Sequence, residues 1–130
     1  MENRRLTLRR NERLSLKRQI DRLFAEGSSF AAYPLRVVFL REPKADPLST
    51  VATLISVPKK RLKHAVDRNY VRRRIRECYR LNKQPLTDLL SSGAEMMLIA
   101  FIYLAAERTT TAVISKAMDK AIRTLCAKLE

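Results

Sequence analysis

The 130-residue sequence is poor in the side chains from which enzymes most often build catalytic and metal sites. It has one histidine and two cysteines, and Cys78 and Cys126 lie far apart with no C-x-x-C spacing. A disulfide framework and a structural zinc site are therefore disfavoured. A Ser-His-Asp triad would depend on His64 alone, and no nucleophile-elbow motif accompanies it. We expect a reduced, cytoplasmic protein with no catalytic or metal-ligating residues of its own.

Long hydrophobic segments are also missing. The longest strongly apolar run, Met96–Ala106, is about half of the roughly 20 residues that a membrane-spanning helix requires. The basic N-terminus is not followed by the apolar region of a signal peptide. The sequence also contains no tryptophan, a residue that interfacial helices often use to enter a membrane surface. We therefore predict that the protein has no membrane partner.

Negative charge is scarce, since 27 Lys and Arg residues face 13 Asp and Glu residues, a formal net charge of +14. The excess is concentrated in two segments: residues 59–80 carry +8 and residues 1–18 carry +5, which leaves the other 90 residues close to neutral. Charge that served only solubility would be spread over the surface. The distribution instead favours two contact zones for a polyanion, with nucleic acid as the leading candidate.

Hydrophobic patterning predicts a single α+β domain over residues 15–130, preceded by a basic arm at residues 1–14. An amphipathic helix is expected from Ser15, which is suited to cap its start, to Gly27, which is suited to cap its end. Segments rich in β-branched and aromatic residues predict strands at 35–40, 50–57 and 95–103, with a brief strand at 28–32. Further helices are expected at 66–81 and after Thr109 or Thr110.

Prolines mark the predicted breaks between these elements. Pro43 and Pro47 predict a loop at 41–47, and Pro85 prevents the helix at 66–81 from continuing far. Residues 86–90 are compatible with a short helical turn or with a loop. The resulting order of helices and strands predicts a two-layer α+β sandwich.

The segment 65–80 gives the strongest functional signal. On a helix at about 100° per residue, Val71, Ile75 and Cys78 form a narrow buried stripe. The opposite face has almost no acid, whereas an ordinary solvated face would mix charges in i,i+4 pairs. Guanidinium groups match phosphate, and an asparagine can bind a base edge or a sugar hydroxyl. We predict that this face binds RNA through Asn69, Arg72, Arg73, Arg76 and Arg80, with Arg68 at its border and with Asp67 and Glu77 orienting arginines by ion pairing.

One sequence motif precedes this helix and a second lies on it. Residues 56–60 read S-V-P-K-K, and residues 65–77 read A-V-D-R-N-Y-V-R-R-R-I-R-E. This arrangement resembles the protein subunit of bacterial ribonuclease P, which carries a strand ending in S-V-x-K-K, a short loop and a helix with A-V-x-R-N-x-x-K-R-x-x-R-E. The spacing agrees without a gap, and the order of elements is similar over residues 13–127.

The resemblance implies a fold and a function. The fold would be the family's α-β-β-β-α-β-α two-layer sandwich, like the second domain of a small-subunit ribosomal protein, with a left-handed crossover against the usual handedness rule. The function would be that of an accessory subunit of the endoribonuclease. The RNA subunit would hold Mg²⁺ and hydrolyse precursor tRNA, releasing the 5′ leader. The protein would bind that RNA subunit and the leader, with no other protein partner required.

The resemblance also implies residue roles. Positions that contact the catalytic RNA are matched by Arg68, Asn69, Arg72, Arg73 and Arg76, together with the strand-end pair Lys59 and Lys60. Positions for leader or tRNA binding are matched by Phe24, Phe39, Arg13 and Lys17. Phe24 would stand on the first helix beside a cleft between that helix and the sheet, although its spacing suits an ordinary core residue equally well. Neighbouring strand residues face opposite ways, so only one of Val38 and Phe39 lines the cleft.

Several positions depart from the family's pattern. Tyr70 occupies the second-arginine position of the R-N-R signature, so the local RNA contact must differ. Residues 62–64 read L-K-H where a hydrophobic-Gly-Asn run is usual, and without that glycine a turn with positive φ is less favoured. Leu54 replaces a common strand glycine. Ile20 and Val38 stand where some relatives carry cleft aromatics, so stacking on the leader is expected to be weaker.

Two alternative functions explain less of the sequence. A non-catalytic ribosomal-type RNA-binding protein explains the charge and the size, but not the motif spacing. A protein-only nuclease would need clustered carboxylates to hold metal ions, and the 13 acidic residues are scattered singly.

Overall fold

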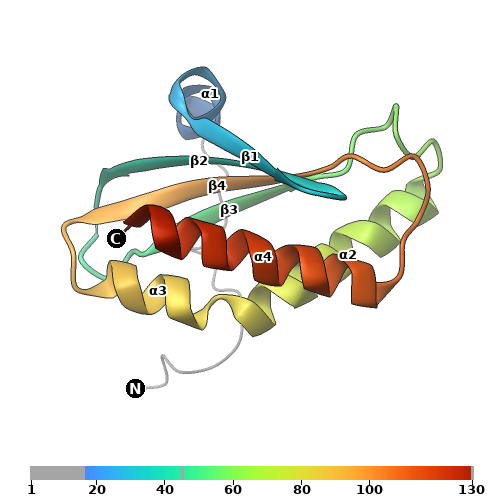
Figure 1. The fold of residues 1–130 in the computed structure, drawn as a ribbon. Coiled ribbons are helices and arrows are strands. Elements are labelled where there is room, and N and C mark those ends of the chain that lie inside the picture. Colours follow the sequence, from blue (N-terminus) through green and yellow to red (C-terminus); the bar gives the residue numbers. More distant parts are fainter. Residues whose placement is uncertain (1–16, 45, 130) are drawn as a thin grey trace.

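A four-stranded β-sheet separates helix α1 from the other three helices in the computed structural model, which describes residues 17–44 and 46–129 (Figure 1). The chain forms, in order, α1 (Lys17–Glu26), β1 (Ser28–Ala32), β2 (Leu35–Pro43), β3 (Val51–Ser56), α2 (Ala65–Asn82), α3 (Gln84–Ser91), β4 (Glu95–Tyr103) and α4 (Thr111–Leu129). The predicted arm at 1–14, the cap Ser15 and the tRNA-binding candidate Arg13 lie outside the described residues.

The strand order in the sheet is β1-β2-β4-β3. β1 with β2, and β2 with β4, pair antiparallel, whereas β3 and β4 pair parallel. Parallel neighbours cannot be joined by a tight turn, so the chain crosses from β3 to β4 through α2 and α3. This crossover places the basic helix α2 beneath the sheet, beside α4 (Figure 1).

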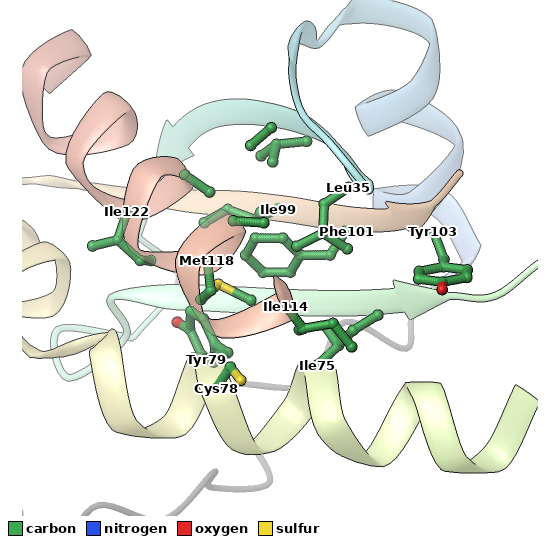
Figure 2. Packing of buried hydrophobic residues seen from close by; sticks show 14 of the residues in the cluster. Leu35, Ile75, Cys78, Tyr79, Ile99, Phe101, Tyr103, Ile114, Met118 and Ile122 are labelled. Atoms are coloured by element: carbon green, nitrogen blue, oxygen red, sulfur yellow. The ribbon is translucent and has the colours of Figure 1, made fainter. Parts of the chain in front are cut away.

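Alternation along the strands divides the hydrophobic residues between the two faces of the sheet. One face carries Val37, Ile99 and Phe101 into the main core, which α2, α3 and α4 cover. Figure 2 shows this core, in which the rings of Tyr79 and Phe101 lie 5.6 Å apart. The other face carries Val38 and Leu98 into a smaller cluster with Leu23 of α1. The predicted two-layer α+β sandwich is therefore confirmed, with α1 as a short cover on the second face.

The structure corrects one predicted break and decides one open alternative. The strand expected to end at residue 40 continues to Pro43, because residues 41–43 still pair with β4 and Pro43 stands at the strand's end, where a missing N–H is tolerated. Residues 86–90, left open between a turn and a loop, belong to helix α3. Pro85 lies in the first turn of α3, where proline favours the start of a helix.

Thr110, before α4, and Gly27, after α1, have different roles at the ends of these helices. Thr110 caps α4, as predicted, by accepting a hydrogen bond from the backbone N–H of Val113 at 3.3 Å. Gly27 follows α1, but it does not have the positive φ of a glycine cap. Its role is steric, because a Cβ at this position would meet the carbonyl oxygens of Leu23 and Phe39. The predicted end of the helix at Gly27 is confirmed, and the Gly27 N–H donates a hydrogen bond of 2.9 Å to the carbonyl of Leu23.

Candidate nucleic-acid interface

The rotation of α2 is fixed by four side chains buried against the core, namely Val71, Ile75, Cys78 and Tyr79. Burial raises the pKa of the Cys78 thiol above its ordinary value, so this cysteine is a protonated packing residue. With these four positions inward, the predicted arginine face points away from the core. Asn69 and Arg73 are exposed, and Arg72, Arg76 and Arg80 are half-buried at its sides.

The polar groups of this face are partly ordered by one another. The Arg72 guanidinium donates a hydrogen bond of 2.8 Å to the side-chain oxygen of Asn69. That bond occupies the carbonyl of the amide and leaves its NH₂ group as a donor. Asn69 is thereby suited to donate to a phosphate, a sugar hydroxyl or a base acceptor.

Arg68 and Arg80 of the basic helix also make hydrogen bonds within the protein. Arg68, at the border of the face, donates to the backbone carbonyls of Leu62 and Lys63 at 3.0 and 2.8 Å. It therefore fixes the loop that follows β3 and carries Lys59 and Lys60, both of which are exposed. None of the described non-glycine residues has a positive φ, so this loop turns without the conformation that the missing glycine would have allowed.

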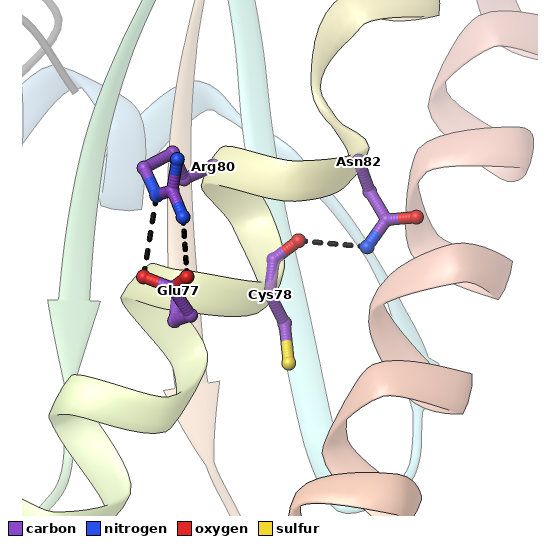
Figure 3. Close-up of polar contacts among 4 residues, drawn as sticks. All are labelled: Glu77, Cys78, Arg80 and Asn82. Atoms are coloured by element: carbon purple, nitrogen blue, oxygen red, sulfur yellow. Dashed lines mark hydrogen bonds and ion pairs between the residues drawn. The ribbon is translucent and has the colours of Figure 1, made fainter. Parts of the chain in front are cut away.

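Arg80 forms the second internal contact. Its Nε and Nη2 atoms reach the two carboxylate oxygens of Glu77 one turn earlier, and the Nε–Oε1 distance is 3.2 Å (Figure 3). The Arg80 hydrogen bonds lower the pKa of Glu77, so the pair is ionised at neutral pH. The prediction that Glu77 orients an arginine is confirmed. Nearby, the Asn82 side chain donates to the carbonyl of Cys78 at 2.7 Å near the end of α2.

The ring of Tyr70, the departure from the motif, contacts two guanidinium groups. The Cζ atom of Arg74 lies 4.6 Å from the ring centroid, and that of Arg108 lies 3.9 Å from it. The hydrogen bond from Arg74 is the largest influence that lowers the pKa of Tyr70. Arg108 also pairs with Asp67 at 3.2 Å. Asp67 thus orients an arginine, as predicted, but the partner comes from the segment before α4.

Sequence reasoning missed Arg108. It lies in the near-neutral part of the chain, 41 residues from Asp67, and no local pattern marks it. The only available signal was a tyrosine within an arginine run, because an aromatic ring attracts a guanidinium from elsewhere in the fold.

On the other face of the sheet, α1 is held by a buried carboxylate. Glu42 accepts hydrogen bonds from Gln19 at 3.1 Å and from Arg22 at 2.6 Å. Phe24 remains 49% exposed, so it is not the core residue that its spacing also allowed. Lys17 is exposed and pairs with Asp21 at 3.2 Å.

The structure separates Phe39 from Phe24. Phe39 faces the main core, where its ring lies 5.9 Å from that of Phe30 and 5.9 Å from Lys128 Nζ. Val38 instead joins Leu23 on the α1 face. Of these two residues it is therefore Val38 that faces α1, because the alternation of β2 turns Phe39 to the opposite side of the sheet. Leader or tRNA binding by Phe39 stays a prediction.

Two other kinds of site are absent from the described residues. Within residues 17–44 and 46–129, no helix is long and apolar enough to cross a membrane. In the same part of the chain, no three His, Cys, Asp or Glu side chains lie together as a metal-binding group.

Comparison with known proteins identifies the family. The family model for ribonuclease P matches residues 8–129. The ribonuclease P protein component of Porphyromonas gingivalis strain W83 is 40% identical over 115 residues, covering 88% of this chain and 83% of the relative. That of Chlorobaculum tepidum is 34% identical and covers 80% of this chain and 71% of the relative.

Solved structures show the same fold. A Staphylococcus aureus RNase P protein mutant superposes with a TM-score of 0.68 at 25% identity, covering 90% of this chain and 88% of that chain. The RNase P protein from Thermotoga maritima gives a TM-score of 0.63 at 25% identity and covers 86% of this chain and 96% of that chain. With the motif, the fold and the relatives in agreement, the chain belongs to the ribonuclease P protein family.

Proposed function

We propose that this protein binds the ribonuclease P RNA subunit through the exposed arginine face of α2 and thereby assists 5′ maturation of precursor tRNA. Membership of the family makes the chain the protein component of this endoribonuclease, with an RNA subunit as its partner. The observation that supports the contact is the outward face of Asn69, Arg72, Arg73 and Arg76, set by the buried stripe on the other side of the helix. Lys59 and Lys60 extend it along the loop that Arg68 fixes.

The chemistry that this surface supports is phosphate binding. Arginines supply planar donor pairs that stay charged at every physiological pH, and each phosphate contact releases condensed counterions from the RNA. We assign the Mg²⁺ ions that activate water to the RNA subunit and the substrate. The positively charged side chains of the α2 face would neutralise closely packed phosphates of the RNA. This would help the RNA to retain its metal ions.

The leader of the precursor tRNA is assigned to the α1 side of the sheet. Phe24 presents a half-exposed ring, and stacking of a base on such a ring contributes roughly 1–3 kcal/mol. Lys17 on the same helix adds an exposed ammonium group. Ile20 on α1 and Val38 on β2 are aliphatic and offer no ring for stacking. Phe24 is therefore the aromatic contact that α1 provides. The cytoplasm, where tRNA precursors are made, is the proposed location.

Reconstitution tests this function. The cognate RNA subunit would cleave precursor tRNA with and without the protein across a series of Mg²⁺ concentrations. We expect the protein to stimulate leader removal most at low Mg²⁺ and to have no cleavage activity alone. Equal cleavage with and without the protein at every Mg²⁺ concentration would contradict the proposal, and cleavage by the RNA-free protein would assign the chemistry to the protein instead.

A further inference from the structure

We propose that Arg108 and the basic pocket beside it form a second phosphate-binding subsite. Tyr70 and Asp67 of α2 contact Arg108 and fix its position relative to that helix. This inference rests on the proposed RNA-binding function and extends it to a different part of the chain. The pocket has a volume of about 490 Å³ and lies between the loop after β3 and the segment before α4. Its cationic side chains are Lys59, Lys60, Arg61, Lys63 and Arg108, with His64 beside them.

The charge of the pocket selects an anion. Five Lys and Arg side chains line it against two acids, Asp67 and Glu107, a balance of +3 with His64 neutral. Asp67 is already engaged by Arg108. Such an excess in a concave site strengthens the local positive potential. Because Lys59 and Lys60 belong both to this pocket and to the proposed α2 interface, the ligand is an RNA phosphodiester, supplied by the RNA subunit or by precursor tRNA.

Arg108 is held in place before any ligand arrives. Its Nη1 atom pairs with Asp67 at 3.2 Å, and its guanidinium lies over the Tyr70 ring at 3.9 Å. Asp67 and Tyr70 both stand on α2, three residues apart, so that they present neighbouring groups on one side of the helix. The bond to Asp67 uses one of the five N–H donors of the arginine, and the rest remain for an anion in the pocket that Arg108 lines.

Tyr70 is a positioning residue in this arrangement. Its ring is partly buried against the main core and is flanked on its faces by Arg74 and Arg108. The attraction between a guanidinium and an aromatic face therefore links the segment before α4 to α2. A side chain without a ring would leave Arg108 attached to Asp67 alone and less constrained relative to the pocket.

Binding titrations with four variants test the subsite. They are Arg108→Ala, Tyr70→Leu, which removes the ring but keeps an apolar side chain, Tyr70→Phe, which keeps the ring, and Arg123→Ala. Arg123 is a matched control because it also pairs with an aspartate, Asp119, on the surface of α4. Affinity for the cognate RNA subunit, and that of the holoenzyme for precursor tRNA with and without its leader, would be measured across a salt series.

We expect Arg108→Ala and Tyr70→Leu to weaken binding of one RNA by about three- to tenfold and to lower the salt slope by about one for the alanine variant. Tyr70→Phe and Arg123→Ala should bind as the natural protein does. The RNA whose affinity falls identifies the source of the phosphate.

Three different results would overturn the subsite, the positioning role of Tyr70 and the proposed function, respectively. Natural affinity and salt slope in Arg108→Ala for every RNA would overturn the subsite, and the proposed function would stand if Arg72→Ala/Arg76→Ala still lost binding. Loss in Arg108→Ala without loss in Tyr70→Leu would overturn the positioning role. If the Arg72→Ala/Arg76→Ala variant also bound normally, the proposed function itself would fail.

Discussion

The ion pair between Arg22 of α1 and Glu42 of β2 should have a coupling free energy that its burial determines. Glu42 has a side chain that is 9% exposed, whereas its partner Arg22 is 45% exposed. Removing one partner of a fully buried ion pair costs about 3–5 kcal/mol, and exposed pairs contribute about 0.2–1 kcal/mol. Because water still reaches Arg22 but little reaches Glu42, we expect a coupling free energy of about 1–2 kcal/mol between them, intermediate between those limits.

A double-mutant cycle measures this coupling directly. Glu42→Ala, Arg22→Ala and the double variant would be unfolded in urea in the absence of RNA, with Gln19 unchanged throughout. The matched cycle uses Asp119 and Arg123, whose side chains are 53% and 74% exposed and whose atoms lie 2.7 Å apart. An i,i+4 helix pair of this kind should couple by about 0.3–0.5 kcal/mol. A Glu42–Arg22 coupling no larger than that of Asp119–Arg123 would refute the argument from burial.

Three further predictions concern packing, pH and the leader. Gly27→Ala should lower the free energy of unfolding by about 1–3 kcal/mol, because its Cβ would lie 2.8 Å from the backbone oxygen of Phe39; an unchanged urea midpoint would contradict this steric role. Burial raises the pKa of Cys78 above the ordinary 9.0, so the native state holds this proton more tightly than the unfolded chain does. The stability advantage of the natural protein over Cys78→Ala should be fully present below pH 9.0 and shrink as the pH rises through the folded pKa, whereas a constant difference across that range would be inconsistent with it. Phe24→Ala should change the free energy of unfolding little and weaken leader-dependent binding of precursor tRNA, while Phe39→Ala should chiefly lower stability; equal leader affinity in the natural protein and Phe24→Ala would remove Phe24 from the leader site.

Much of the fold follows from local patterns. The period of the apolar residues predicts the buried stripe of α2 and the last helix, because each of these helices packs one continuous face. The continuous apolar run at 95–103 predicts the central strand β4, which is buried on both faces. The same pattern predicted that Asn69 and Arg73 would be exposed. These features depend on neighbours within one or two turns, which the sequence lists side by side.

Other features depend on contacts between distant segments. Val38 and Phe39 are adjacent and similar in hydrophobicity, so only the position of α1 tells which one faces it. Glu42 lay in a predicted loop, yet it is buried because Gln19 and Arg22, 23 and 20 residues away, supply donors. Arg108 joins the basic region only because the crossover brings the segment before α4 beside Tyr70.

The central claim is that the arginine face of α2 binds the RNA subunit, and the salt dependence of that binding tests it most directly. The variant Arg72→Ala/Arg76→Ala would be compared with Lys120→Ala/Arg123→Ala, which removes the same charge from exposed positions of α4. We expect the α2 variant to bind the cognate RNA subunit more weakly and its logarithmic salt slope to fall by about 1.5–2, while the α4 variant keeps the natural slope. An unchanged slope in the α2 variant, or an equal fall in both variants, would contradict the claim.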